Sequence, residues 1–191
     1  MNKPGRLFGF SLPIAAIFLS SCTDPASKLP NYGSIPAFTM TDSQGRAFER
    51  SALAGKVLIV DFIYTNCPAE CPVMTARMHR VERRVRGERD VELLSISVDP
   101  VRDTPPVLNA FAHRFGGPTP QWTFLTGTPA TVHLLAYETF HVGDVIGKIE
   151  HSTKFILVDK SGDIRGYYSS FDEDGIPSML KDAEALRRER F

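Results

Sequence analysis

Two cysteines separated by three residues follow directly after a dense apolar run, in the string YTNCPAECP. Cys67 would lie in a loop and Cys71 in the first turn of the next helix, so that a spacing of four can bring both thiols to one side of the turn. A helix N-terminus lowers the pKa of a thiol and favours the thiolate, which is the form that binds metals. Three interpretations follow: a structural disulfide, a redox-active dithiol, or a site for a soft metal ion. Two cysteines alone are too few for structural zinc or an iron–sulfur cluster.

A metal site needs a further ligand, and the sequence has five histidines. His151 is the best placed of them, because it lies in a loop directly before the apolar run FILVD, which predicts a central strand. Met74 and Met78 offer thioether sulfurs, but their helical spacing is typical of core residues. The other histidines fall within or at the end of helical stretches: His79, His113, His133 and His141.

The N-terminal segment has the layout of a secretory signal. Lys3 and Arg6 precede the apolar stretch 7–19, which is too short to span a bilayer comfortably. The string LSSC, which ends at Cys22, resembles a bacterial lipoprotein box, in which the cysteine is lipidated and becomes the mature N-terminus. We therefore expect a lipoprotein signal peptide over residues 1–21, rather than an ordinary signal peptide or an uncleaved anchor.

The remainder divides into a linker and one domain. Residues 22–34 are rich in proline, serine and other turn-forming residues, which predicts a linker that lifts the domain off a membrane. Residues 35–191 would form the domain, on the periplasmic face of a bacterial membrane. The formal net charge of zero argues against a nucleic-acid partner, which would require a basic excess.

The domain alternates strand-like and helix-like patterns. Strands are predicted at Val57–Ile63, Val91–Val98, Trp122–Leu125, Phe155–Asp159 and Ile164–Tyr168. Helices are predicted at residues 71–86, 105–115, Pro129–Phe140 and Ile176–Arg188. This order indicates an α/β domain whose central sheet is covered by helices on both faces.

Four strings resemble the Sco/SenC family when taken in order: DFIYTNCPAECPVM, SISVDPVRDTPPVL, WTFLTGT and EHSTKFILVDKSGDIRGYY. The resemblance covers roughly residues 35–188. It implies a thioredoxin-like fold with a mixed sheet, and one copper ion bound by Cys67, Cys71 and His151. It places Asp99 near the site as a residue that is not a firm ligand. A turn or helix-capping role for Asp99 is the alternative.

The resemblance also implies a role and partners. Members help to assemble the CuA centre of cytochrome c oxidase, so the expected partners are its CuA subunit, other copper chaperones and, through the lipid anchor, the membrane. Family members often carry Asp between the cysteines where this chain has Ala69, and the negative charge would move here to Glu70. We expect a copper-binding assembly factor rather than a turnover enzyme.

Two other activities are possible for such a domain. The principal alternative is a thiol:disulfide oxidoreductase that keeps the copper-site cysteines of the oxidase reduced through Cys67 and Cys71. A peroxidase of the same fold would use a sensitised cysteine near an arginine and a threonine. Thr65 lies two residues before Cys67, but a second cysteine four residues on is not the usual peroxidase arrangement.

Overall fold

A seven-stranded mixed sheet organises the part of the chain that the computed structural model describes, residues 29–142 and 153–189. The strand order is β2-β1-β5-β4-β3-β6-β7. The strands are β1 (Thr39–Asp42), β2 (Ala47–Glu49), β3 (Val57–Ile63), β4 (Val91–Ser97), β5 (Trp122–Thr126), β6 (Lys154–Val158) and β7 (Ile164–Ser169). The helical segments are η2 (Arg50–Leu53), α1 (Glu70–Val85), α2 (Pro105–Arg114), α3 (Pro129–His133), η3 (Leu134–Thr139) and α4 (Gly175–Arg188).

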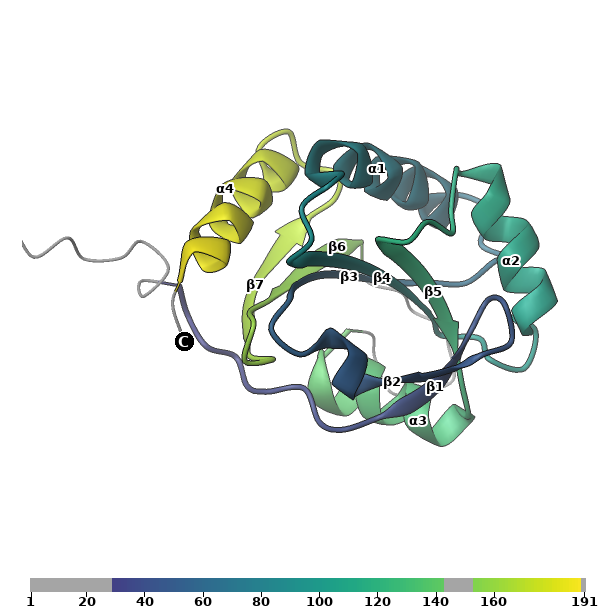
Figure 1. The fold of residues 1–191 in the computed structure, drawn as a ribbon. Coiled ribbons are helices and arrows are strands. Elements are labelled where there is room, and N and C mark those ends of the chain that lie inside the picture. Colours follow the sequence, from purple (N-terminus) through teal and green to yellow (C-terminus); the bar gives the residue numbers. More distant parts are fainter. Residues whose placement is uncertain (1–28, 143–152, 190–191) are drawn as a thin grey trace, which may run out of the picture.

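Helices lie on both faces of this sheet. Helices α1, α2 and α4 lie on one side and α3 on the other (Figure 1). Strand β3 is buried along its whole length because it serves both cores. Ile59 and Ile63 pack into the core beneath α1, α2 and α4, whereas Leu58 and Val60 pack into the core on the α3 side. The predicted α/β architecture, a mixed sheet flanked by helices, is confirmed.

Three parallel strands form the middle of the sheet. Strand β4 pairs in parallel with both β3 and β5, and β6 runs antiparallel to β3. Because parallel strands end at the same edge, the loop after β3 (residues 64–69) lies beside the loop after β4 (residues 98–104). We call this the thiol edge. In open α/β sheets, the carboxyl ends of the strands are where ligand sites form.

Two parts of the fold differ from the sequence-based expectation. The hairpin of β1 and β2 and the short helix η2 that follows it were not predicted, although Gly45, with φ of 82°, supplies the left-handed residue of the hairpin turn. The single helix expected over Pro129–Phe140 consists of α3, which is five residues long, followed by the π-helical segment η3. The other predicted elements are present, with bounds shifted by a few residues.

The last residues of the expected linker lie against the domain. Arg165 on β7 donates hydrogen bonds to the carbonyls of Leu29 and Pro30, both at 3.0 Å, and also pairs with Asp159. Backbone hydrogen bonds then join Tyr32 and Gly33 to the start of β7. Strand β7 starts beside the end of β6, and β6 runs antiparallel to β3, so the start of β7 lies at the same end of the sheet as the start of β3. Residues 29–34 are therefore held at the edge of the sheet opposite the thiol edge.

Several predicted features lie outside the described residues. These are the signal peptide, the lipidation site Cys22 and the proposed ligand His151. Over the described ranges, no helix combines the length and apolar character needed to cross a bilayer.

Candidate metal and redox site

The two cysteines meet where β3 leads into α1. Both are free thiols and both are buried, with Cys67 5 % exposed and Cys71 fully enclosed. The backbone N–H of Cys71 donates a hydrogen bond to the Cys67 sulfur at 3.3 Å. Ala69, which precedes α1, gives the helix no side-chain cap, so the Cys67 sulfur occupies the position of a capping acceptor.

The two thiols differ in acidity. Partial burial disfavours the Cys67 thiolate, but hydrogen bonds from the backbone N–H groups of Cys71 and Ala69 outweigh this effect and lower the pKa of Cys67. Burial raises the pKa of Cys71 far above the usual thiol range, against a hydrogen bond from the Tyr64 backbone, and negative charge on Cys67 and Asp61 adds to the rise. Cys67 is therefore the thiol that ionises first, and the helix N-terminus stabilises it.

Two side chains contact the Cys67 sulfur. Glu70 Oε2 lies 3.7 Å from it, within the range of a sulfur hydrogen bond. Burial raises the pKa of Tyr64 to about 12, and a hydrogen bond to Cys67 contributes to the rise. Tyr64 thus stays protonated at neutral pH and donates to the sulfur, while Glu70 brings a carboxylate to the same atom.

A buried acid lies on the core side of the pair. Asp61 is on the face of β3 that α1 covers, and it is fully buried opposite Ser95 of β4. Burial raises the pKa of Asp61 to about 7, and the neighbouring Ser95 hydroxyl offsets that effect only in part. The sequence analysis did not single out Asp61, although an acid within the run VLIVDFI is the signal that could have found it.

Two aspartates of the β4–α2 loop have different roles. The carboxylate of Asp99 pairs with Arg102 at 2.7 Å, and its backbone carbonyl accepts the N–H groups of Arg102 and Asp103. These contacts fit the turn-forming role that the sequence left open for Asp99. Asp103, which the sequence analysis passed over, is fully buried and accepts hydrogen bonds from Thr65 and Ser97.

The described residues do not supply a third ligand to the thiols. Among them, no group of three or more His, Cys, Asp or Glu side chains is arranged to hold a metal ion. Thr153, two residues after His151, is described, and its carbonyl accepts hydrogen bonds from the backbone N–H and the hydroxyl of Ser170 at 2.9 and 2.5 Å. The Ser170 carbonyl in turn accepts a hydrogen bond from Arg77 on α1.

The remaining sulfur and imidazole side chains have other surroundings. Met74 and Met78 are fully buried in the core beneath α1, which confirms the interpretation that they are core residues. The His79 ring stacks on Trp122 with 6.3 Å between ring centroids. The other described histidines are exposed: His113, His133 and His141.

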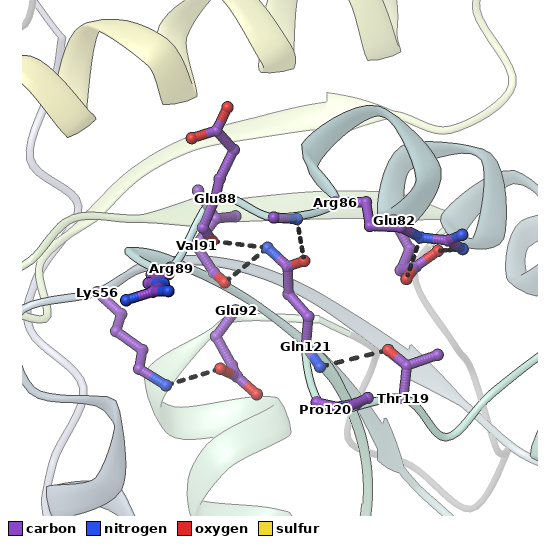
Figure 2. Close-up of a pocket in the computed structure, with 11 residues that line it drawn as sticks. Lys56, Glu82, Arg86, Glu88, Arg89, Val91, Glu92, Thr119, Pro120 and Gln121 are labelled. Atoms are coloured by element: carbon purple, nitrogen blue, oxygen red, sulfur yellow. Dashed lines mark hydrogen bonds and ion pairs between the residues drawn. The ribbon is translucent and has the colours of Figure 1, made fainter.

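A pocket lies at the edge of the sheet opposite the thiols, where β3, β4 and β5 begin. Its lining includes Lys56 and Glu92, which form an ion pair at 2.8 Å, and Gln121, whose amide is directed at backbone carbonyls (Figure 2). The ion pair leaves no net charge at Lys56 and Glu92. The pocket lies at the opposite edge of the sheet from the cysteines and is not part of their site.

Comparison with known proteins identifies the family. A family model described as SCO1/SenC matches residues 27–186, which is most of the chain. The chain belongs to the SCO1/SenC family.

Solved structures of SCO1/SenC relatives share the fold. A SCO1/SenC family lipoprotein from Bacillus anthracis is 31 % identical, with 83 % of this chain and 97 % of that chain covered and a TM-score of 0.75. BsSco, described as a Sco-family cytochrome c oxidase assembly protein with a disulfide switch, is 28 % identical over 85 % and 97 % of the two chains, with a TM-score of 0.74. Copper-bound ScoI from Bradyrhizobium japonicum is 25 % identical over 81 % and 99 %, with a TM-score of 0.66. The resemblance in the four strings and the thioredoxin-like fold are thus confirmed.

Proposed function

We propose that this SCO1/SenC protein binds one copper ion through Cys67 and Cys71 and acts as an assembly factor for cytochrome c oxidase. It would deliver copper to the CuA centre or prepare that centre for it. The observation that carries the proposal is the meeting of two free thiols at the N-terminus of α1. The copper-bound ScoI structure and the role described for BsSco support the choice of metal and of recipient.

The donor chemistry fits copper. Two adjacent sulfurs are soft ligands, which suit Cu(I) and, with an imidazole, also Cu(II). Cys67 is disposed to ionise, whereas the Cys71 proton must be displaced when the metal binds. Binding should therefore release protons and weaken as pH falls. Asp99, which is paired with Arg102, would influence the site from outside the set of copper ligands.

We propose His151 as the third ligand. Thr153 is tied through Ser170 to Arg77 on α1, the helix that carries Cys71. Because consecutive Cα atoms are about 3.8 Å apart, His151 can lie at most about 8 Å, Cα to Cα, from this anchored residue. This tether supports a place for His151 at the thiol edge.

Thiol–disulfide exchange is the second candidate, and the difference in acidity between the thiols favours it. The Cys67 thiolate would attack a disulfide of the recipient and release one recipient sulfur, forming a mixed disulfide. Cys71, after losing its proton, would displace the second recipient sulfur and close a Cys67–Cys71 disulfide. The recipient gains two electrons and two protons, and this protein is oxidised. The disulfide switch described for BsSco supports this chemistry.

The setting would be the outer face of a bacterial membrane. The Bacillus anthracis relative is described as a lipoprotein, which supports lipidation of Cys22 here. We propose that the lipid anchor holds the domain on the periplasmic side, where the CuA subunit and other copper chaperones would meet it.

Copper binding by purified variants tests the ligand set. Reduced wild type should retain one copper per chain, and Cys67→Ser or Cys71→Ser should lose both Cu(I) and Cu(II). Air-oxidised protein with the Cys67–Cys71 disulfide should take up none. Equal copper uptake by the oxidised and reduced forms would rule out the thiolates as ligands.

The visible spectrum tests His151 separately. His151→Ala should keep part of the Cu(I) binding, because two thiolates suffice for a soft ion of low coordination number, and should lose most of the stable Cu(II) complex. The thiolate-to-Cu(II) charge-transfer absorption should bleach or shift. His113→Ala, which removes an exposed histidine of α2, is the matched control. A wild-type spectrum for His151→Ala would remove it from the ligand set.

A further inference from the structure

Asp103 joins the two loops of the thiol edge. Its carboxylate accepts hydrogen bonds from the Thr65 hydroxyl at 2.5 Å, the Thr65 backbone N–H at 3.1 Å and the Ser97 hydroxyl at 2.6 Å. Thr65 belongs to the loop after β3, whereas Asp103 and Ser97 belong to the end of β4 and the loop that follows it. A single side chain therefore fixes the separation of the two loops.

This carboxylate is buried and held by hydrogen bonds, not by a direct ion pair. Asp103 is fully enclosed, and within the described part of the chain it makes no ion pair; the adjacent Arg102 pairs with Asp99 instead. An ionised carboxylate in such a place depends on the hydrogen bonds that it accepts. Loss of any donor is therefore costly, so the geometry of Thr65 is held firmly.

Thr65 directly follows Tyr64, the residue that contacts both sulfurs. Its neighbour Tyr64 accepts the backbone N–H of Cys67 at 3.3 Å through its carbonyl. The Tyr64 hydroxyl is hydrogen-bonded to the Cys67 sulfur, and the Tyr64 backbone N–H to the Cys71 sulfur. Any displacement of Thr65 would move Tyr64, and with it the contacts of both thiols.

We propose that Asp103 is a positioning residue for the thiol pair, which acts through Thr65 to hold Cys67 and Cys71 so that both sulfurs converge on one point. The inference rests on the proposed function for its copper readout, but convergence of the sulfurs is equally required for disulfide formation. Asp103 does not itself contact the metal; it orients the residues that do, as outer hydrogen-bond partners do in metal sites.

The decisive variants remove single contacts. Asp103→Asn keeps the shape of the side chain and loses its charge. Thr65→Val keeps the size of Thr65 and removes only the hydroxyl donor. Thr65→Ser restores that donor and is the matched control, and Val101→Ala, which alters an exposed side chain of the loop that carries Asp103, controls for changes in the loop itself.

Two readouts apply to each variant. The first is the copper affinity, measured by equilibrium competition with a chelator, together with the Cu(II) charge-transfer spectrum. We expect Thr65→Val and Asp103→Asn to lower copper affinity by about 10- to 100-fold, the usual effect of removing an outer partner, and to shift the spectrum. Thr65→Ser and Val101→Ala should behave as wild type. The second readout is the rate of Cys67–Cys71 disulfide formation in oxidised glutathione without metal, which should fall in the same two variants.

The outcomes separate positioning from folding. Urea unfolding of the reduced, metal-free protein reports stability. A loss of stability with unchanged copper affinity, spectrum and oxidation rate would show that Asp103 only supports the fold, and would overturn the proposal. If Asp103→Asn does not fold, Thr65→Val against Thr65→Ser decides. If wild type binds no copper, the proposed function fails, while the oxidation rates still test the positioning.

Discussion

The site at the residue scale is an asymmetric thiol pair. Cys67 accepts N–H groups at the start of α1 and ionises readily, whereas Cys71 is enclosed and resists ionisation. For exchange chemistry, this asymmetry assigns attack to Cys67 and resolution to Cys71. For copper binding, it means that the metal must displace the proton of Cys71, so that affinity depends on pH through that thiol.

Asp61 gives the first prediction, on the pH dependence of stability. Burial raises its pKa from 3.8 to about 7 in the folded protein. Between these values the folded state binds the proton and the unfolded state does not, so the contribution of Asp61 to stability falls as pH rises from about 4 to about 7, by on the order of 4 kcal/mol. Asp61→Asn cannot titrate. The free energy of unfolding of Asp61→Asn relative to wild type should therefore increase over this range and level off above it.

Urea unfolding of the reduced, metal-free proteins at several pH values measures this difference. Comparison with Asp61→Asn cancels the titration of all groups that the two proteins share. A difference that stays constant from about pH 4 to pH 8 would mean that Asp61 ionises normally in the folded protein.

The sequence predicted the position of the two thiols better than it predicted the side chains that support them. The Cys–x₃–Cys spacing and the preceding apolar run were enough to expect Cys67 and Cys71 side by side at a helix start. Asp103 was missed because its role depends on β4 bringing the loop after it beside Thr65, a contact across 38 residues that no local pattern encodes. Asp61 was missed because an acid in a strand pattern does not show which face it occupies.

At the scale of elements, apolar periodicity predicted the central strands and α1 well. Strands β3 and β4 are rich in apolar residues and buried along their whole length because both faces are covered, and Met74 and Met78 mark the buried stripe of α1. The β1–β2 hairpin was missed because its strands are only four and three residues long, and β1 is only partly buried while β2 has no buried residue. The local sequence pattern gives only a weak signal for β1, because pairing with the distant strand β5 defines this strand.

Gln121 gives the second prediction, on the connection between α1 and β4. Its Nε2 lies 2.9, 2.8 and 3.1 Å from the carbonyls of Val85, Glu88 and Val91, and so closes the turn between the two elements (Figure 2). Gln121→Ala removes this shared donor, while the carbonyls of Val85 and Glu88 keep their backbone N–H donors, so the free energy of unfolding should fall by about 0.5–1.5 kcal/mol. Gln121→Glu, which turns a carboxylate oxygen toward them, should cost at least as much.

Urea unfolding measures the effect, with Arg83→Ala on the exposed side of α1 as the control. Copper binding should be unchanged in both Gln121 variants, since Gln121 lies at the edge of the sheet opposite the thiols. Wild-type stability of Gln121→Ala would indicate that water replaces the amide fully.

In the molecule as a whole, the segment by which the chain enters the domain and the thiol pair lie at opposite edges of the sheet. The chain joins the domain at residues 29–34, beside the start of β7, and the cysteines lie beyond the far end of β3. From Cys22 to Leu29 there are seven residue steps, which span at most about 25 Å. A lipid on Cys22 would thus hold the domain close to the bilayer by the edge that carries no thiols, and leave the thiol edge accessible to a partner.

This arrangement gives the third prediction. Cys22→Ser should block lipidation and release the domain from the membrane fraction, or leave an unprocessed precursor. Copper binding by the purified domain should be unchanged, because the contacts of residues 29–34 with Arg165 and Ile164 lie at the opposite edge from Cys67 and Cys71. Labelled palmitate should be incorporated into wild type and not into Cys22→Ser. Cys67→Ser is the reciprocal control, since it should keep the label and lose copper. Absence of label in wild type would exclude lipidation at Cys22, and loss of copper binding in soluble Cys22→Ser would show that attachment and metal binding are coupled.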